Sequence, residues 1–266
     1  MKLNKLQLGI LIGTLVLIIV LVYMPRTQQQ QTATRDIPKA QNIDAKCFET
    51  FVDSLYKAMP AELNAQLKAL TPYPDSAIRL ATSKNQNVIA ANIAQQAYAN
   101  STDAASLKKI AGRYYNATKF STENNCVNSY CYSKAVEGFN KVLSANPNDL
   151  EAKTLLGSCY VETSDNPMQG ITLLREVVTT DSTYIDAHLR LAMFAVQSKQ
   201  YDKAVARFEK ILKINPKYTE AYLYIGEVYA SMGNKSMAIK NLQTFKEKSN
   251  DALVINEVDK YIRQLK

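Results

Sequence analysis

The sequence predicts an all-α protein in which one N-terminal transmembrane helix precedes a solenoid of repeated helix pairs. Three observations predict this fold class. A run of 20 uncharged residues follows Lys5. From Ile43 onward, apolar residues recur at spacings of three and four, the period of a helix that buries one face. In the C-terminal half, a pattern of small and bulky residues returns about every 34 residues, which indicates a repeat architecture.

Composition limits the classes of function. The chain has 266 residues, of which 47% are apolar and 21% are charged, the usage of a folded globular protein. The first 46 residues hold 6 basic and 2 acidic residues, so they carry +4 of the net charge of +8. The remaining +4 is too weak to predict a nucleic-acid-binding surface. One histidine and four cysteines leave little for metal binding or acid–base catalysis.

Residues 6–25 are predicted to be a transmembrane anchor behind a short N-terminal tail, residues 1–5. At a rise of about 1.5 Å per residue, the uncharged stretch spans roughly 30 Å, the thickness of the hydrocarbon core of a bilayer. The competing interpretation is a cleaved signal peptide, whose apolar region is usually shorter and ends at a small-residue cleavage site. The sequence YMPR at the end of the stretch offers no such site, so we expect an uncleaved anchor.

Charges on either side of the anchor predict its orientation. Lys2 and Lys5 precede it, whereas Arg26 and Arg35 follow it with Asp36 nearby. Positive charge tends to stay on the inner side of a membrane, so the small N-terminal excess favours an inside tail and an exported body.

Two further features of the N-terminal region bear on oligomerisation and on the linker between the anchor and the body. Gly9 and Gly13 form a GxxxG pair that would let two spans pack as a homo-oligomer, although chance spacing in an apolar run is the simpler explanation. Residues 26–42 are polar and rich in glutamine, which is typical of a flexible tether.

Residues 43–102 are predicted to be a helical N-terminal region, made either of degenerate repeats or of an N-terminal helical cap. An apolar stripe begins at Ile43, and Pro60 stands where the first turn of a helix favours proline. The segment 71–76 is rich in turn residues. Further helices are expected near residues 76–83, 87–100 and 103–119.

The repeat itself is carried by small residues at fixed places. Gly157, Ala192 and Gly226 follow one another at spacings of 35 and 34. A second series has spacings of 35, 34 and 34 and consists of Ala135, Gly170, Ala204 and Ala238. Small residues let two helices approach closely, and bulky residues then fill the space between neighbouring pairs.

These units resemble the tetratricopeptide repeat (TPR) family, whose pattern places Leu-Gly and Tyr in the first helix and Ala, an aromatic residue and Pro in and after the second. The matching residues are Leu156, Gly157, Tyr160 and Gly170, then Leu191, Ala192, Tyr201, Ala204, Phe208 and Pro216, then Tyr222, Ile225, Gly226, Tyr229, Gly233 and Ala238. The resemblance implies repeat units within residues 103–250, at about 103–149, 150–184, 185–218 and 219–250, and a C-terminal capping helix at 251–266. The first unit is interrupted by an enlarged turn of about 11 extra residues, STENNCVNSYC. In its first helix, Gly112 is assigned to the position of the family's glycine.

By the family pattern, the first helix of each pair lines a concave groove that binds protein or peptide partners. The predicted partner-binding residues are Lys109, Arg113, Asn116, Thr154, Ser158, Leu189, Met193, Val196, Leu223 and Glu227. The family's clamp for a terminal carboxylate does not fit, because Leu155 and Asp186 replace required polar and basic residues. We expect a helix or an extended peptide on the apolar part of the groove, with an ordinary solenoid surface as the alternative.

The cysteines and the histidine are expected to be structural. In an oxidising compartment, Cys126 and Cys131 would form a disulfide within the enlarged turn; in a reducing one, both would be free thiols. Cys47 and Cys159 lie in apolar helical patterns and are interpreted as small buried residues. His188 stands at a packing position, and no nucleophile has a recognisable partner, so no catalytic residue, metal site or cofactor is predicted.

Together these features predict a non-catalytic, single-pass membrane scaffold that binds protein partners, with its body in the bacterial periplasm. Two alternatives remain open. One is a body that faces the cytosol as a receptor for chaperones or precursor proteins. The other is a cleaved, secreted TPR subunit of an enzyme complex.

Overall fold

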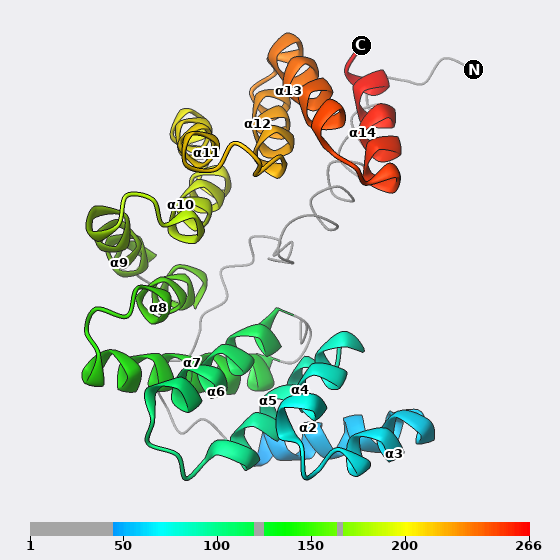
Figure 1. Cartoon of the computed structure of the whole chain (residues 1–266), viewed down its shortest axis with the longest axis vertical. Coiled ribbons are helices and arrows are strands. Elements are labelled where there is room, and N and C mark those ends of the chain that lie inside the picture. Colours follow the sequence, from blue (N-terminus) through cyan, green and yellow to red (C-terminus); the bar gives the residue numbers. More distant parts are fainter. Residues whose placement is uncertain (1–44, 120–124, 164–166) are drawn as a thin grey trace. The chain divides into compact units, whose positions relative to one another are not determined.

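The computed structural model describes residues 45–119, 125–163 and 167–266, and every regular element in these ranges is an α-helix (Figure 1). Within these ranges no helix is both long and apolar enough to span a bilayer. The predicted anchor at residues 6–25 lies outside them, as do the tail, the tether and the Gly9–Gly13 pair.

The described ranges hold thirteen helices. In chain order they are α2 (Ala45–Ala58), α3 (Ala61–Ala69), α4 (Pro74–Ser83), α5 (Asn87–Tyr98), α6 (Ala104–Thr118), α7 (Asn125–Ala145), α8 (Leu150–Thr163), α9 (Pro167–Thr180), α10 (Ile185–Gln197), α11 (Tyr201–Ile214), α12 (Glu220–Ser231), α13 (Lys235–Lys248) and α14 (Ala252–Leu265).

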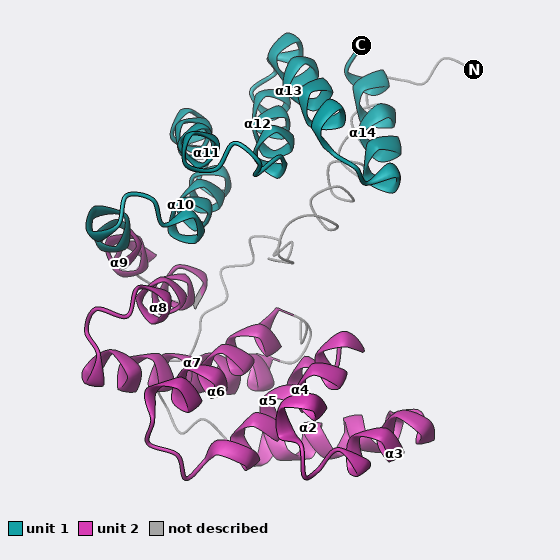
Figure 2. Ribbon diagram, in the orientation of Figure 1, with its two compact units in different colours: residues 1–31, 175–266 teal, residues 32–174 magenta. Residues whose placement is uncertain are grey.

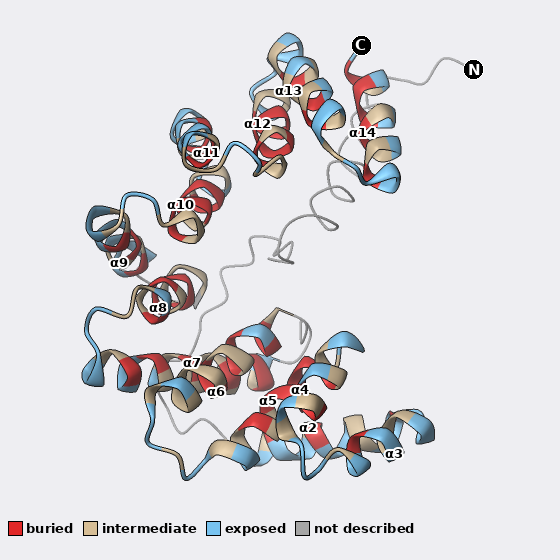
Figure 3. Ribbon diagram, viewed as in Figure 1, coloured by how far each residue is buried: buried red, intermediate tan, exposed pale blue. Residues whose placement is uncertain are grey.

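The helices fall into two compact units, which are divided within α9 (Figure 2). The N-terminal unit contains the described residues up to Leu174, and the C-terminal unit contains Arg175–Lys266. In both units the buried residues lie on the faces that neighbouring helices turn toward each other (Figure 3). This is the burial that the spacing of apolar residues predicts.

In the N-terminal unit, consecutive helices pack side by side. Helix α5 packs against α4 and α6, α6 packs against α7 and α8, and α2 lies against α5 and α7. Pro74 occupies the first turn of α4, where its missing N–H costs nothing, and the Asp103 carboxylate caps α6 by accepting from Ser106 N at 2.9 Å.

The predicted disulfide is wrong. Cys126 is bonded to Cys47 of α2, 79 residues earlier, with their Cα atoms 6.5 Å apart, while Cys131 is a free, buried thiol. The expected enlarged turn is helical from Asn125 onward, because α7 begins there. Five residues along a helix correspond to a rotation of about 140°, so Cys126 and Cys131 leave α7 in different directions and cannot pair.

Cys47 is therefore a bridging residue rather than the small buried residue expected, whereas Cys159 is fully buried as expected. Aromatic rings pack beside the bridge: the Phe48 ring lies 4.6 Å from the Tyr130 ring and 5.7 Å from the Tyr114 ring. The bridge and these rings together fasten α2 to α6 and α7.

Close helix approach occurs where the small residues of the repeat lie. A Cβ atom on Gly170 would stand 2.7 Å from Val161 Cγ2 and 2.8 Å from Val161 N, and one on Gly226 would stand 2.8 Å from Leu242 Cγ. Only glycine fits such contacts without movement of the neighbouring helix.

Gly112 does not occupy the position of close helix approach that the sequence pattern assigns to it. A Cβ atom there would meet nothing within 4 Å. The close approach in the first unit involves its neighbour Ala111, which is fully buried, because a Cβ atom on Gly138 of α7 would stand 2.7 Å from Ala111 Cβ. The sequence assignment of this unit is therefore wrong by one residue, and Gly112 faces open space.

In the C-terminal unit, α10 packs against α11 and α12 against α13, while α14 packs against α13. The turns within these two pairs share one geometry: Lys199 and Gly233 have φ of 58° and 77°, and each stands two residues before the second helix. Asn85, with φ of 59°, takes the same place between α4 and α5 of the N-terminal unit.

The hydrogen bonding of the three turns matches as well. Gln86 N donates to Ala81 O at 2.8 Å, Gln200 N to Ala195 O at 2.7 Å, and Asn234 N to Tyr229 O at 2.9 Å. The α4–α5 hairpin thus turns in the same way as two pairs of the recognisable repeats, although its sequence is diverged.

Candidate partner-binding site

Helices α6 and α8, which are first helices of neighbouring pairs, form a cleft of about 400 Å³. Its described lining is Ala105, Lys108, Lys109, Gly112, Arg113, Tyr115, Asn116, Glu151 and Leu155. The structure therefore brings the predicted residues Lys109, Arg113 and Asn116 together on one face of α6, as the spacing of four and three residues requires.

An ion-pair network closes one end of this cleft, which we call the α6–α8 cleft. Lys108 Nζ lies 3.0 Å from Asp149 Oδ2 and 2.7 Å from Glu151 Oε2, at the start of α8. Carboxylates in the first turn also favour the positive N-terminal end of that helix. The network joins the two helices and leaves Lys108 already paired.

Lys109 is paired as well. Its Nζ atom lies 2.8 Å from Asp75 Oδ1 and 4.5 Å from the centre of the Tyr98 ring, and the Tyr98 hydroxyl donates to the same carboxylate oxygen at 2.7 Å. The hydrogen bond from Lys109 holds the pKa of Asp75 below its ordinary value, and the Asp75 carboxylate raises the pKa of Lys109. Both groups therefore stay charged at neutral pH, and their charges offset each other.

Arg113 is the cation left for a partner. Its guanidinium donates to Thr82 Oγ1 at 3.3 Å, and it forms no ion pair with any residue that the structure describes. Asn116 is exposed one turn further along α6, and Gly112 beside it leaves open space. The recognition surface of the α6–α8 cleft is thus a guanidinium and an amide next to the half-buried Leu155.

Glu162, at the other end of α8, was not found by sequence reasoning. It accepts hydrogen bonds from the hydroxyls of Tyr115 at 2.9 Å and Tyr132 at 3.0 Å, and it pairs with Lys119, whose Nζ lies 4.4 Å from the centre of the Tyr115 ring. Its partners are 30 to 47 residues away, so no local pattern marks it. This cluster fixes α6, α7 and α8 at the far end of the cleft.

Thr154 and Ser158 of α8 do not line the cleft. Both are fully buried, and their hydroxyls donate to Leu150 O at 2.7 Å and Thr154 O at 3.0 Å within the helix. The expectation that they face an open groove is wrong, because neighbouring helices cover this side of α8.

The predicted apolar groove of the C-terminal unit is filled by the protein itself. Leu189 and Met193 of α10 belong to a core cluster with Tyr224 and Val228 of α12, and only Val196 is half-buried. The expectation of an open apolar surface on α10 is therefore wrong.

Leu223 and Glu227 of α12 are enclosed in the same unit. Leu223 packs in a cluster with Val258 and Tyr261 of α14. Glu227 is 8% exposed, its Oε1 has no hydrogen-bond partner among the described residues, and burial raises its pKa to about 8. This carboxyl is therefore an acid held inside the unit rather than a group displayed to a partner.

His188 is buried with both ring nitrogens occupied. Arg207 donates to Nδ1 at 3.1 Å, and Nε2 lies 3.1 Å from Ser182 O, which requires the neutral tautomer with its proton on Nε2. Burial lowers the pKa of His188 below its ordinary value. Among the described residues, no three or more His, Cys, Asp or Glu side chains gather in a way that would hold a metal ion.

Comparison with known proteins shows what this chain is similar to. Residues 195–254 match the model of the tetratricopeptide repeat family. The matched stretch runs from the end of α10 to the start of α14. Superkiller protein 3 of Schizosaccharomyces pombe is 24% identical over 137 residues, which are 49% of this chain and 9% of that protein. Hsp70-Hsp90 organizing protein 3 of Arabidopsis thaliana is 22% identical over 176 residues, 66% of this chain and 27% of that protein.

The chain thus spans well under a third of the length of either relative. Among solved structures, a thermophilic TPR protein of Thermus thermophilus is 17% identical. The match covers 73% of this chain and 98% of that one at a TM-score of 0.55. The likeness concerns the fold: an all-α helical-repeat solenoid.

Proposed function

We propose that this TPR chain is a non-catalytic scaffold that holds a protein partner in the α6–α8 cleft and is anchored to a membrane by residues 6–25. One observation carries the binding role. In the α6–α8 cleft, Arg113 and Asn116 remain available beside the open space at Gly112, while the neighbouring lysines are held by carboxylates of the chain itself.

The cleft favours a peptide over a highly charged polymer. One available guanidinium, one exposed amide and an apolar wall suit a peptide segment that offers a carboxylate or carbonyl beside an apolar side chain. Nucleic acid binding relies on many available cations, and here Lys108 and Lys109 are already paired. The name of one relative, an Hsp70-Hsp90 organizing protein, also supports protein partners.

The uncharged stretch 6–25 supports the anchor, since its length suits a bilayer. The Cys47–Cys126 disulfide supports a body in an oxidising compartment, which in a bacterium is the periplasm. Trapping of thiols in intact cells tests the compartment. We expect Cys47 and Cys126 to resist alkylation until a reductant is added; alkylation of both without reductant would place the body in a reducing compartment instead.

A scaffold without catalysis also agrees with the chemistry of the described residues. The one histidine is buried, with its two nitrogens engaged by Arg207 and Ser182, so it cannot serve as a general base in the α6–α8 cleft.

Quantitative crosslinking of partners in native membranes tests the binding role. We expect Arg113→Glu and Gly112→Leu to lower recovery of the partner at least tenfold without lowering the melting temperature, because Gly112 faces open space. Arg263→Glu is the matched control, since Arg263 is an exposed arginine of α14 in the other unit. Equal recovery by all three variants would remove the cleft as the binding site.

A further inference from the structure

A second cleft lies in the N-terminal unit, away from the α6–α8 cleft and outside the residues that match the family model. Its volume is about 650 Å³, within the range of ligand-binding pockets. Helices α2, α3, α4 and α5 and the turn before α4 all contribute to its walls. We call it the α2–α5 cleft.

The floor of this cleft is apolar, and its walls carry side-chain amides. Leu67, Ala77 and Ile93 supply apolar surface from three helices. Asn64, Asn92 and Gln96 supply the amides. An amide offers both a donor and an acceptor, which is the complement of a peptide group.

One of these amides lacks a partner. Asn64 Oδ1 is enclosed and has no hydrogen bond among the described residues. An enclosed acceptor without a donor destabilises the fold, because the oxygen has lost its hydrogen bonds to water. The terminal torsion of asparagine is soft, so a small rotation turns this oxygen toward a donor placed in the cleft. The unsatisfied oxygen therefore favours a ligand that brings an N–H group.

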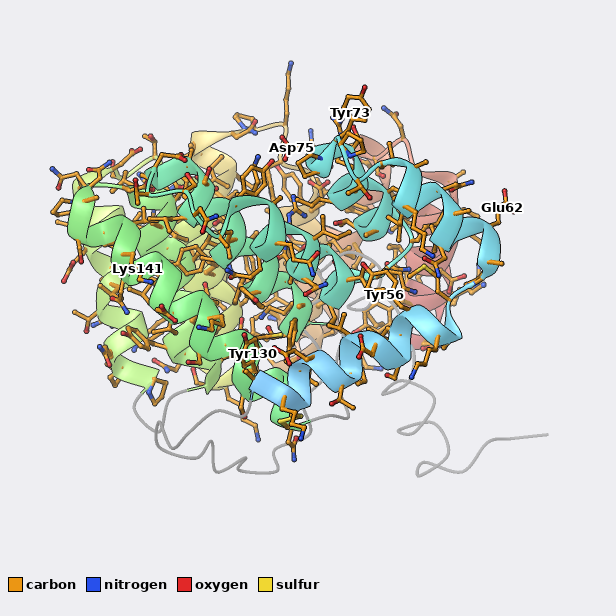
Figure 4. The ribbon with its side chains drawn as sticks, turned by 90° about the horizontal axis from the view of Figure 1, so that it is seen from below. Tyr56, Glu62, Tyr73, Asp75, Tyr130 and Lys141 are labelled. Atoms are coloured by element: carbon orange, nitrogen blue, oxygen red, sulfur yellow. A yellow bond between two sulfur atoms is a disulfide. The ribbon has the colours of Figure 1, made fainter. Side chains whose placement is uncertain are left out.

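Tyr56 lines the wall of the cleft that α2 contributes, and burial raises the pKa of its hydroxyl. Figure 4 shows Tyr56 on the side of α2 that faces the neighbouring helices, whereas Glu62 of α3 points away from the body. Cys47, near the start of α2, is bonded to Cys126 of α7, so the helix that carries this wall is held in place covalently.

The charge at the rim has one sign. Lys68 is the ionisable cation of the described lining; it is exposed and forms no ion pair with any described residue. None of the described lining residues is acidic. A carboxylate on the ligand would therefore find a partner at the rim, and a cationic ligand would be repelled.

We propose that the α2–α5 cleft binds an extended peptide segment that places an apolar side chain on Leu67 and Ile93, donates a backbone N–H to Asn64 and sets a carboxylate beside Lys68. This site is separate from the α6–α8 cleft, so the chain would hold two polypeptide segments through different residues. Two sites on one chain would give a scaffold a second point of attachment.

Fluorescence anisotropy with the full chain in lipid nanodiscs tests the proposal. The probes are two labelled pentapeptides, acetyl-Asp-Leu-Phe-Leu-Glu-amide and acetyl-Lys-Leu-Phe-Leu-Lys-amide. We expect the acidic peptide to bind at least tenfold more tightly than the basic one. Ala97→Trp should lower its affinity at least tenfold, because Ala97 is exposed within the cleft and a large ring there fills the space.

Two matched pairs of variants separate binding from folding. Ala65→Trp is the control for Ala97→Trp, since Ala65 is an exposed alanine of α3 outside the cleft. Lys57→Glu is the control for Lys68→Glu, since Lys57 is an exposed lysine of α2 outside it. Lys68→Glu should reverse the preference between the two peptides, and both controls should bind as the unaltered chain does.

Three outcomes would overturn the proposal: equal affinity for the two peptides, no effect of Ala97→Trp, or loss of binding in the controls as well. A fourth outcome would assign the cleft to a lipid: dodecanoate binds the unaltered chain but not Ala97→Trp, and neither peptide binds. Gly112→Leu, which obstructs the α6–α8 cleft, should leave peptide binding here unchanged, so the two sites can fail independently.

Discussion

The two units of this chain are stabilised by different kinds of interaction. In the N-terminal unit, links between residues far apart in the sequence are prominent: the Cys47–Cys126 bridge spans 79 residues, Lys108–Asp149 spans 41 and Lys119–Glu162 spans 43. In the C-terminal unit, the small and bulky residues of the repeat pack each helix against its neighbour. Where the repeat pattern has diverged, specific covalent and polar links take over the role of regular packing.

Loss of the disulfide is expected to have the largest effect. Closing a loop of about 80 residues stabilises a fold by about 2–5 kcal/mol. The double variant Cys47→Ala, Cys126→Ala should lose this much stability in the N-terminal unit, measured by urea denaturation and by hydrogen exchange of α2.

The same denaturation with a reductant supplies the control. Reductant should destabilise the unaltered chain and leave the double variant unchanged. If the unaltered chain unfolds at the same urea concentration with and without reductant, the bridge does not fasten this unit.

Glu227 is expected to make the stability of the C-terminal unit depend on pH. Its folded pKa of about 8 lies above the ordinary value of 4.5, so the folded state retains a proton that the unfolded state has lost. The contribution of Glu227 to stability is therefore complete below pH 4.5 and falls by about 1.4 kcal/mol per unit as the pH rises toward 8.

Urea denaturation of the unaltered chain and of Glu227→Gln between pH 6.5 and 8 measures this slope. The variant should remove most of it, because a neutral amide does not titrate. His188, whose pKa burial lowers, titrates in the same way in both proteins, so the difference between their slopes reports Glu227 alone. Identical slopes for the two proteins would show that Glu227 is not held as an acid.

Substitution of glycine by alanine should change stability in opposite directions at two kinds of position. Gly226→Ala should destabilise the C-terminal unit by about 1–3 kcal/mol, since the new Cβ atom meets Leu242. Gly112→Ala should stabilise the N-terminal unit by up to about 1 kcal/mol, because alanine is the better helix former and meets nothing there. Melting temperatures of the two variants check both signs, and a loss of stability in Gly112→Ala would restore Gly112 to the packed place that the sequence assigned to it.

The smallest effect is expected at the turn within the α10–α11 pair. Lys199 has a φ of 58°, a conformation that glycine adopts without strain, as Gly233 does at the equivalent place. Lys199→Gly should therefore stabilise the C-terminal unit by at most about 1 kcal/mol, and Lys203→Gly, within α11, should destabilise it by a similar amount. A lower melting temperature for Lys199→Gly would show that the side chain of Lys199 matters more than its backbone.

The regular part of this fold could be predicted from the sequence, since it depends on local patterns. The periods of three and four residues predict the helices, and the recurrence of Gly157, Ala192 and Gly226 predicts how pairs pack. The partner of Cys126 could not be predicted, because it lies 79 residues away on a helix with no repeat pattern.

The candidate site could be predicted only in part, because some of its features depend on local spacing and others on contacts between helices. Lys109, Arg113 and Asn116 share a face by helical spacing alone, whereas the burial of Leu189 and Leu223 depends on neighbouring helices whose side chains fill the expected groove. A family pattern tells which side of a helix faces inward, but it does not tell how much of that side remains open.

Hydrogen exchange of the full chain with and without its crosslinked partner tests the central claim most directly. We expect slower exchange at α6 and α8, where Arg113 and Asn116 offer the binding surface, and unchanged exchange on the exposed face of α7. Protection of α7 or of the C-terminal unit, without protection of α6, would contradict it.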